Sequence, residues 1–518
     1  MLTQALSEPY TRSKRLMNLR ALVKWGALGA VSLLAFYLIL ALYLQRQFMF
    51  AILFLVLTGS ALYVFARSKA YTYRYIFPAL AGMSVFVLFP LFYTVAIGFT
   101  NYSADNLLTL PRVQQVLLSH TYQVAGGRHD FELREQGGRY RLSITDDQDA
   151  RLVTAPFSLD AFGKRQKLSL QPAGSQPIAG DKVNLRGIIQ HKKALNDLTL
   201  VLPDKTLLSM VSLRSFGAVK PLYTLHSDNT LVNNKTGDVY YPNDKSGFYE
   251  SAKGETLSPG WTVAIGWANY VRVLTDPTIR GPFIQIFTWT VTFALLTVVF
   301  TLGLGLLLAS LLQWDQVRGK SFYRTMLILP YAVPAFISIL IFKGLFNQNF
   351  GEINLVLQHL FGVRPDWFSD PFLAKVMILI VNTWLGYPYM MLLSMGLLQS
   401  IPRDLYEASA MDGAGPIDNL FRITIPLIIK PLMPLLIASF AFNFNNFVLI
   451  ALLTNGAPDI IGASTPAGTT DLLVSYTYRI AFQDAGQNFG LAAAIATVIF
   501  LLVGGLSLIN LKLSKVKV

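Results

Sequence analysis

The sequence predicts a mainly α, polytopic helical membrane protein with eight transmembrane helices and a β-rich extracytoplasmic domain inserted after the third. Of its 518 residues, 53% are hydrophobic and only 14% are charged, whereas soluble domains carry about 25% charged residues. Apolar runs long enough to cross a bilayer core of roughly 30 Å as helix recur along the chain. One long polar interval, between the third and fourth runs, alternates apolar and polar residues as β-strands do.

Eight apolar runs are the predicted membrane spans. They are Val23 to Leu42, Phe48 to Ala66, Ile76 to Phe99, Phe283 to Leu312, Thr325 to Phe342, Val376 to Leu398, Leu432 to Leu453 and Leu491 to Leu511. The first run follows a basic segment, lacks a small-residue cleavage site and is longer than the apolar core of a signal peptide. We therefore expect it to be a retained membrane anchor.

Basic residues between the spans predict the orientation of the chain. They occur after the second, fourth and eighth runs: Arg67, Lys69 and Arg74, then Arg318, Lys320 and Arg324, then Lys512, Lys515 and Lys517. The positive-inside rule places these segments and both termini in the cytoplasm. Lys343, Arg364 and Lys375 fit poorly, because their segment would lie outside. We expect a multi-pass protein of the bacterial inner membrane with its large domain in the periplasm.

Composition excludes several chemistries. The formal charge is +14, but the basic residues lie at the ends of apolar runs rather than on a soluble face, so no nucleic-acid partner is expected. The sequence contains no cysteine and only five histidines, and it contains neither a phosphate-binding loop nor an H-E-x-x-H motif. We expect no enzyme activity, metal site or cofactor in this chain, so any ATP chemistry must belong to another subunit.

Three domains follow from this pattern. Residues 1–100 form an N-terminal cytoplasmic arm and the first three spans, residues 101–282 form the periplasmic β-rich domain, and residues 283–518 form a core of five spans with a cytoplasmic loop at 399–430. In the middle domain, FELREQGGRYRLSI predicts a hairpin closed at Gly137-Gly138. The segments KLSLQP, KVNLRGIIQ, LTLVL and DVYYP are predicted strands. We expect a small sandwich that docks an outside partner, in preference to a disordered insertion.

The spans favour transport of a neutral solute. Their cores contain no Asp, Glu, Arg, Lys or His, although coupling to an ion normally needs such a residue at depth. In SFAFNFNNFVLI, Ser439, Asn443 and Asn446 fall within about 60° of one another on a helix, flanked by Phe442. Amides suit sugar hydroxyls and aromatic faces suit the C–H face of a sugar. The alternative remains open that these amides bond a neighbouring helix.

Two other segments carry similar features. In NTWLGYPYMM, Gly386 and Pro388 are expected to loosen the helix, and Leu385 and Tyr389 lie four residues apart on one face. In LPYAVP, Tyr331 stands between two prolines. An aromatic belt at the membrane interface is the alternative for these tyrosines.

The cytoplasmic loop contains EASAMDGAGP, from Glu407 to Pro416. Pro402 and Asp404 predict the start of a short helix, Asp412-Gly413 predicts a turn, and Pro416 begins a second short helix that should end before Pro426. Small side chains allow this elbow to enter a groove of another protein. A plain surface turn is the alternative.

EASAMDGAG, with Phe421 and Pro426 after it, resembles the EAA loop of permease subunits of binding-protein-dependent ABC importers. Ser409 departs from the commonest pattern. With LPYAVP, NTWLGYPYMM and SFAFNFNNFVLI, the resemblance extends over essentially the whole chain to the large permease subunits, of MalF type, of bacterial maltose/maltodextrin importers.

The resemblance implies two sets of site residues. The residues that couple to an ATPase would be Glu407, Ala408, Ser409, Met411, Asp412, Gly413, Ala414 and Gly415. The sugar-binding residues would be Tyr331, Leu385, Gly386, Tyr389, Ser439, Phe442, Asn443, Asn446 and Val448. An ideal helix puts Val448 opposite Ser439, so only a local kink would bring it to the site.

The implied function is import of maltose and maltodextrins by alternating access, powered by ATP that other subunits hydrolyse. The implied partners are a second permease of MalG type, two MalK-type ATPase subunits that use ATP and Mg, a periplasmic maltose-binding protein, the sugar and the lipid bilayer. Another oligosaccharide remains open. A secondary carrier is disfavoured by the lack of intramembrane charge, and a receptor by inside segments of only about 30 residues.

Overall fold

The computed structural model describes residues 8–45, 47–145, 150–159, 166–173, 178–314 and 316–513. The chain forms two compact units, Met1–Ala104 with Ala264–Val518, and Asp105–Val263. Of the residues used above to orient the chain, Lys515 and Lys517 lie outside the described part.

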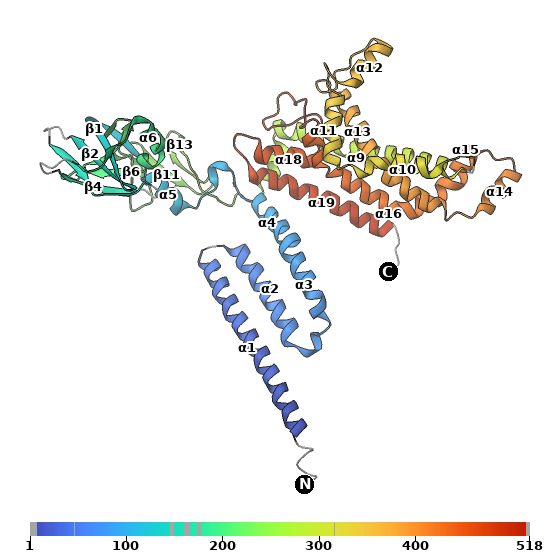
Figure 1. Cartoon of the computed structure of the whole chain (residues 1–518), viewed down its shortest axis with the longest axis horizontal. Coiled ribbons are helices and arrows are strands. Elements are labelled where there is room, and N and C mark those ends of the chain that lie inside the picture. The colour runs from blue at the N-terminus through green and yellow to red at the C-terminus, as the bar shows by residue number, and fades with distance from the viewer. Residues whose placement is uncertain are drawn as a thin grey trace, which may run out of the picture. The chain divides into compact units, whose positions relative to one another are not determined.

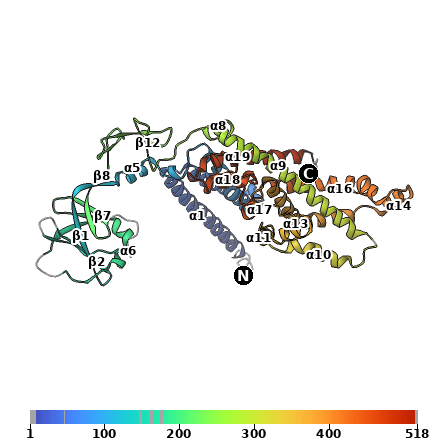
Figure 2. The ribbon, with the colours of Figure 1, turned by 90° about the horizontal axis from the view of Figure 1, so that it is seen from above.

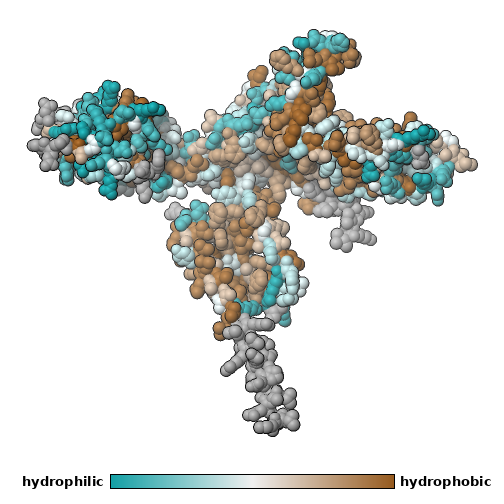
Figure 3. All heavy atoms as spheres, viewed as in Figure 1, coloured by the Kyte–Doolittle hydropathy of each residue, from teal (hydrophilic) through white to brown (hydrophobic). Residues whose placement is uncertain are grey.

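The first unit is helical (Figure 1). Its N-terminal segment contains α1 (Glu8–Leu44), α2 (Phe48–Ala66), α3 (Tyr73–Met83) and α4 (Phe89–Gly98). Its longer C-terminal segment contains α8 (Ala268–Thr275), α9 (Pro277–Gln313), α10 (Lys320–Ala332), α11 (Ala335–Leu345), α12 (Glu352–Phe361), α13 (Pro371–Leu398), α14 (Arg403–Met411), α15 (Pro416–Asn419), α16 (Ile425–Phe444), α17 (Phe447–Leu453), α18 (Leu473–Phe482) and α19 (Phe489–Leu513). Hydrophobic residues cover much of the outer surface of α2 to α4 (Figure 3), as contact with lipid requires.

The membrane spans largely follow the apolar runs. Among the described residues, six helical segments are long and apolar enough to span a bilayer, namely Leu22–Leu44, Phe48–Ala66, Tyr73–Gly98, Pro277–Gln313, Pro371–Leu398 and Pro416–Phe444. The bent pair of α10 and α11 raises the number to seven, and the shorter apolar helix Phe489–Gly505 lies in the eighth predicted run. The polytopic helical fold is confirmed.

The fifth predicted span is not a single continuous helix. α10 and α11 are bent by 92° at the break between them. Pro334 has no N–H to continue the helical hydrogen bonding, and the residue before a proline avoids helical backbone angles. Val333 accordingly has φ −85° and ψ 131°. The fifth predicted span, Thr325 to Phe342, is thus a bent pair of helices with the break inside LPYAVP.

The sixth span is also different from expectation, because α13 runs without interruption through Gly386 and Pro388. Close packing on α9 accounts for the glycine: a Cβ built on Gly386 would lie 2.8 Å from Cγ2 of Thr301. One on Gly305 of α9 would lie 2.7 Å from the backbone nitrogen of Met391. Small residues let the two backbones approach closely, so the predicted loosening of this helix is wrong.

The described part of the second unit contains two β-sheets (Figure 2), and each sheet has its own hydrophobic core. The larger sheet contains β1 (Thr121–Gln136), β2 (Arg139–Thr145), β3 (Arg151–Thr154), β4 (Gln166–Pro172), β5 (Asp181–Lys182), β6 (Leu198–Val201), β7 (Leu207–Ser212) and β8 (Ser215–Pro221). The smaller contains β9 (Tyr223–Leu225), β10 (Leu231–Asn233), β11 (Val239–Asn243), β12 (Phe248–Ser251) and β13 (Thr256–Leu257). Three short helices accompany them, α5 (Leu110–Leu118), α6 (Leu185–Gln190) and α7 (Lys192–Asn196).

The larger sheet closes on itself and is not half of a sandwich. Its order is β2-β3-β4-β6-β7-β8-β1-β5, with β1 also paired to β2. β1 can bond both neighbours because it is 16 residues long, so that Thr121 to Asp130 pair with β8 and Phe131 to Gln136 pair with β2. A register shift between Gln123 and Arg128 marks the irregularity that bends such a strand. The sandwich prediction is therefore wrong.

Most strand predictions are confirmed. The Phe131–Ile144 hairpin pairs β1 with β2 in antiparallel register, and Gly137 and Gly138 both have positive φ, 58° and 76°, as a two-residue primed turn requires. KVNLRGIIQ is the exception. Its Asn184 side chain accepts a hydrogen bond from the Gly187 amide and caps α6, so most of this segment is helical.

Candidate functional site

The candidate site begins at a break in the seventh span. α16 ends at Phe444 and α17 begins at Phe447, which leaves Asn445 and Asn446 between two helices. Asn446 has φ −77° and ψ 74°, and its side-chain oxygen accepts a 3.4 Å hydrogen bond from the Leu449 amide. An asparagine that caps the start of a new helix favours an interrupted helix over a continuous helix here.

Asn382 of α13 joins both sides of this break. Its amide nitrogen donates to the side-chain oxygen of Asn443 at 2.8 Å and to the Thr297 hydroxyl of α9 at 3.1 Å. Its amide oxygen accepts from the Asn446 amide at 3.2 Å. These bonds connect α9, α13, α16 and the start of α17 through neutral polar groups.

The amides of this cluster are occupied by protein partners in the described conformation. Asn443 is only 5% exposed, and its nitrogen donates to the backbone oxygen of Ser439 at 2.8 Å. The alternative raised by the sequence, that such amides bond a neighbouring helix, therefore describes Asn443 here. A sugar hydroxyl that enters must exchange with one of these hydrogen bonds.

The aromatic and aliphatic residues of the predicted site are more accessible. Tyr389 is 39% exposed, Phe442 73%, Tyr331 58% and Val448 49%. Tyr389 follows Asn382 by seven residues of unbroken helix, so the two lie about 20° apart on one face of α13. Val448 belongs to α17, after the break, so the ideal-helix geometry that set it opposite Ser439 does not apply.

Two predicted site residues have packing roles. Leu385 is half-buried against the cluster of apolar residues around Trp289 and Phe293. Gly386 faces Thr301 of α9 closely, as described above. Their polar neighbour Asn382 was missed by the sequence reasoning, although it begins NTWLGYPYMM. Its spacing of seven from Tyr389 was a usable signal.

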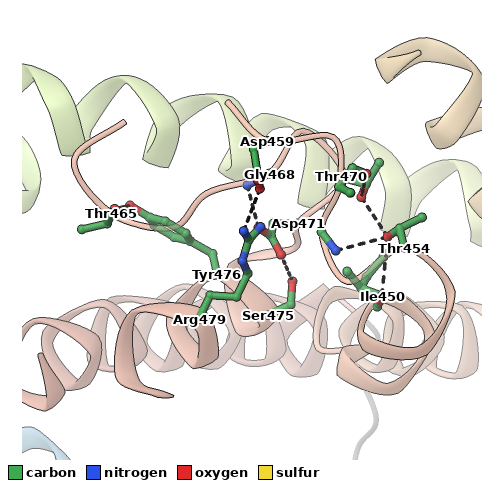
Figure 4. A network of polar contacts seen from close by, with 12 residues as sticks. Ile450, Thr454, Asp459, Thr465, Gly468, Thr470, Asp471, Ser475, Tyr476 and Arg479 are labelled. Carbon is green, nitrogen blue, oxygen red and sulfur yellow. Dashed lines mark hydrogen bonds and ion pairs between the residues drawn. The ribbon is translucent and has the colours of Figure 1, made fainter. Parts of the chain in front are cut away.

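A buried charge cluster outside the predicted spans was also missed (Figure 4). Arg479 of α18 donates to Asp471 at 2.8 Å and to Asp459 at 2.7 Å. Asp471 is fully buried and also accepts from the Ser475 hydroxyl and the Gly468 amide. Burial lowers the pKa of Arg479, but hydrogen bonds and the two carboxylate charges outweigh it and raise the pKa. The cluster ties the loop after α17 to α18.

The loop at 399–430, which the sequence predicts to be cytoplasmic, forms an exposed elbow. α14 begins after Pro402 as predicted, and its C-cap is Asp412. Gly413 has a φ of 79°, and its amide donates to the Ala410 oxygen at 3.0 Å. The turn predicted at Asp412-Gly413 is confirmed.

The second arm of the elbow is not a separate short helix. α15 passes through a π-helical turn, Leu420–Thr424, directly into α16. Pro426 is the second residue of α16, directly after this π-helical turn. The prediction that this helix ends before Pro426 is therefore wrong.

The predicted coupling residues share one exposed region of the elbow. Met411 is 88% exposed, and Glu407, Ala408, Asp412 and Gly413 are exposed as well. Ser409, Ala414 and Gly415 are half-buried in its inner side. The Ser409 hydroxyl donates to the Asn419 side chain at 2.7 Å and so joins α14 to α15.

Comparison with known proteins matches nearly the whole chain. The matching families are "MalF, N-terminal region, transmembrane helices" (residues 22–69), "Maltose transport system permease protein MalF P2 domain" (108–266) and "Binding-protein-dependent transport system inner membrane component" (301–512). The maltose/maltodextrin transport system permease protein MalF of Escherichia coli (strain K12) is 57% identical over 504 residues, 96% of this chain and 97% of that protein. MalF of Salmonella typhimurium is 57% identical over 503 residues, with the same coverage. A crystal structure of a bacterial alginate ABC transporter, in complex with an alginate pentasaccharide-bound periplasmic protein, is 21% identical with a TM-score of 0.42, and the match covers 48% of this chain and 83% of that one.

Proposed function

The chain belongs to the MalF family of maltose/maltodextrin permeases, and from that premise we propose how its parts divide the work of import. It is the membrane-embedded permease subunit of an ATP-driven importer, and it moves maltose and maltodextrins into the cytoplasm by alternating access. The observation that carries the proposal for the sugar path is the break between α16 and α17, joined by hydrogen bonds to Asn382.

The sugar path lies along this break. Asn443, Asn446 and Ser439 supply amide and hydroxyl groups, while Tyr389, Phe442 and Tyr331 supply accessible aromatic faces. Leu385, Gly386 and Val448 shape the walls. Neutral amides can both donate to and accept from sugar hydroxyls, so the path needs no charge and suits an uncharged polyol.

Hydrogen-bond exchange links sugar binding to helix movement. In the described conformation, Asn382 holds α13 to both sides of the break. A buried amide left without a partner would cost about 1 to 3 kcal/mol. A sugar that bonds Asn443 or Asn446 replaces the contacts with Asn382, so these contacts can break without that cost. Binding of sugar is thereby coupled to separation of α13 from α16 and α17.

The elbow transmits the energy of ATP hydrolysis. Glu407, Ala408, Met411, Asp412 and Gly413 present an exposed surface of two carboxylates beside small and apolar groups, and Ser409, Ala414 and Gly415 are half-buried next to it. Because α15 continues into α16, a displacement of the elbow is carried by a continuous helical path toward the break. The ATPase that displaces it, with ATP and Mg, is a separate subunit.

The remaining parts follow the membrane topology. We place both termini and the elbow in the cytoplasm and the Asp105–Val263 unit in the periplasm, in the bacterial inner membrane. The periplasmic unit docks a maltose-binding protein, and the helical unit pairs with a second permease of MalG type and two MalK-type ATPase subunits. The chain itself binds no cofactor and catalyses no reaction.

A transport assay tests this function. The importer containing this chain is reconstituted in vesicles with ATP on the ATPase side, and labelled oligosaccharides are supplied with and without the outside binding protein. Uptake of maltose and short maltodextrins that needs both ATP and the binding protein is the expected result. Uptake of a different oligosaccharide in place of maltose favours the second candidate, a permease for another sugar of the same importer class, and uptake without ATP contradicts both.

A further inference from the structure

The turn between α2 and α3 encloses a pocket that the transport function does not use. Tyr63, Arg67, Lys69, Ala70 and Tyr73 line about 370 Å³ at this turn; we call it the α2–α3 pocket. Both flanking segments, Phe48–Ala66 and Tyr73–Gly98, are apolar enough to span a bilayer. A short turn between two spans lies at a membrane surface, where lipid head groups surround it.

The charge around this pocket is unbalanced. The sequence contains no Asp or Glu from Pro9 to Ala104, so no local carboxylate neutralises the basic residues of the turn. Two basic residues near the pocket, Arg74 and Lys24, have backbone oxygens as partners instead of carboxylates. Arg74 donates to the oxygens of Val64, Phe65 and Arg67, and Lys24 donates to the Ala66 oxygen at 3.5 Å. Both therefore stabilise the carbonyl end of α2, as cations at a helix C-terminus do.

The two cations that line the pocket are different. Within the described part of the chain, the side chains of Arg67 and Lys69 have no hydrogen-bond or carboxylate partner. Arg67 is held over the Tyr63 ring at 4.7 Å, so its guanidinium is oriented before any ligand arrives. Ala70 closes the base of the pocket and is only 4% exposed.

We propose that the α2–α3 pocket binds the phosphate head group of an anionic phospholipid. Arg67 and Lys69 neutralise the phosphate, and Tyr63 and Tyr73 form walls of the amphipathic kind that suits the boundary between head groups and acyl chains. Clusters of basic residues beside a span attract anionic lipid; here a defined pocket adds a site. The proposal requires only that this turn lie at a membrane surface and is independent of the sugar path.

A lipid is the favoured occupant over a free phosphate for a geometric reason. The apolar surfaces of α2 and α3 continue from the pocket along the bilayer, with exposed side chains such as Tyr73, Ile76 and Leu80. An occupant with acyl chains can contact these surfaces while its phosphate lies between the two cations. A free anion gains only the contacts with the cations.

The test uses the purified importer in detergent with a photoactivatable phosphatidylglycerol, and labelled peptides are mapped. Three forms are compared: the natural chain, Arg67→Gln with Lys69→Gln, and the matched control Arg318→Gln with Arg324→Gln, which removes two basic residues from another predicted cytoplasmic turn. In the natural chain, we expect saturable labelling of residues 60–76. Since each cation near a membrane surface contributes about fivefold in affinity, half-maximal labelling in the pocket variant should need roughly 30-fold more lipid, with little change in the control.

Several outcomes overturn the proposal. Equal labelling by a matched phosphatidylcholine probe shows no head-group selection, and equal labelling of the pocket variant shows that the two cations are not the site. Competition by glycerol 3-phosphate at low concentration identifies a small-anion site instead of a lipid site. Assembly of the double variant is judged by its elution with the other subunits. If it does not assemble, Lys69→Gln alone replaces it, and half-maximal labelling should then need roughly fivefold more lipid.

Discussion

Asn382 and Asn443 face each other from different helices and share a 2.8 Å hydrogen bond, donated by the Asn382 amide to the Asn443 side-chain oxygen. Both side chains are 5% exposed. The bond lies beside the break between α16 and α17, and the same Asn382 side chain accepts from Asn446 beyond the break. One amide therefore fixes the position of an interrupted helix whose own backbone cannot do so.

Replacing Asn382 by Leu should loosen this region. The substitution leaves the Asn443 oxygen without its partner, at a cost of about 1 to 3 kcal/mol. Thermal unfolding of the assembled importer should begin at lower temperature, and sugar uptake should fall. Asn445→Leu is the control, because Asn445 is exposed and its side-chain amide donates to the local Ala441 oxygen rather than to another span. Equal stability of both variants would show that the amide cluster does not hold the break.

Tyr389→Ala should reduce uptake through loss of an aromatic face. Stacking of this kind contributes about 0.5 to 1.5 kcal/mol, so uptake at limiting sugar should fall up to about tenfold. Tyr389→Phe retains the ring and should retain most uptake. Assembly with the other subunits should be unchanged in both. Unaltered transport by the Ala variant removes Tyr389 from the proposed path.

Gly413→Pro should uncouple transport from ATP hydrolysis. Proline fixes φ near −65°, whereas Gly413 has 79°, and it also removes the amide that donates to Ala410. The chain should still insert and assemble, but sugar-stimulated ATP hydrolysis should be lost.

Gly362→Pro is the matched control for the elbow. Gly362 has a φ of 71° and its amide donates to Gln358 at the end of α12, so the same local damage occurs far from the coupling residues along the chain. Normal sugar-stimulated hydrolysis in the Gly413 variant, or equal loss in both, argues against transmission through the elbow.

Arg479→Met should destabilise the helical unit, because Arg479 is buried although it lies outside the predicted spans. It leaves Asp471 buried without its cation, which typically costs about 3 to 5 kcal/mol. Asp459→Asn removes the other carboxylate, but that side chain is 73% exposed, so its effect should be below about 1 kcal/mol. Proteolysis of the loop between α17 and α18 measures the difference. Similar resistance in the two variants contradicts a role of the buried pair in holding this loop.

The Asp105–Val263 unit should lose stability in acid when Glu132 becomes protonated. Burial raises the pKa of this carboxyl, but the hydrogen bond from Arg134 and the charges of Arg134, Lys182 and Arg151 outweigh it and lower the pKa below its ordinary value. A group whose folded pKa is depressed stabilises the fold above its unfolded pKa, and this contribution is lost as pH falls through the folded pKa.

Hydrogen exchange of β1 and β2 can measure this contribution. Protection in the natural chain should exceed that in Glu132→Gln by about 1 kcal/mol near neutral pH, since the side chain is 25% exposed and partly screened. The difference should vanish well below the ordinary pKa of glutamate. A difference that persists in acid would show that packing, not charge, is responsible.

The sequence by itself determined the polytopic helical fold, the β-rich insertion and the Gly137-Gly138 hairpin. It also predicted the turn of the elbow. These features depend on local chemistry: an apolar run must avoid water, and two adjacent glycines permit positive φ. The stripe of Ser439, Asn443 and Asn446 was predicted from one continuous helix, whereas α16 ends at Phe444 and Asn446 caps α17.

Tertiary structure decided which of these local tendencies prevailed. Gly386 and Pro388 did not loosen α13, because α9 packs closely against it, while Val333-Pro334 did bend the fifth span by 92°. The partner of Asn443 proved to be Asn382, 61 residues away, and Arg479 found two carboxylates across a loop. Hydrogen bonds between distant segments depend on how the backbones pack, and periodicity within one segment carries no information about that packing.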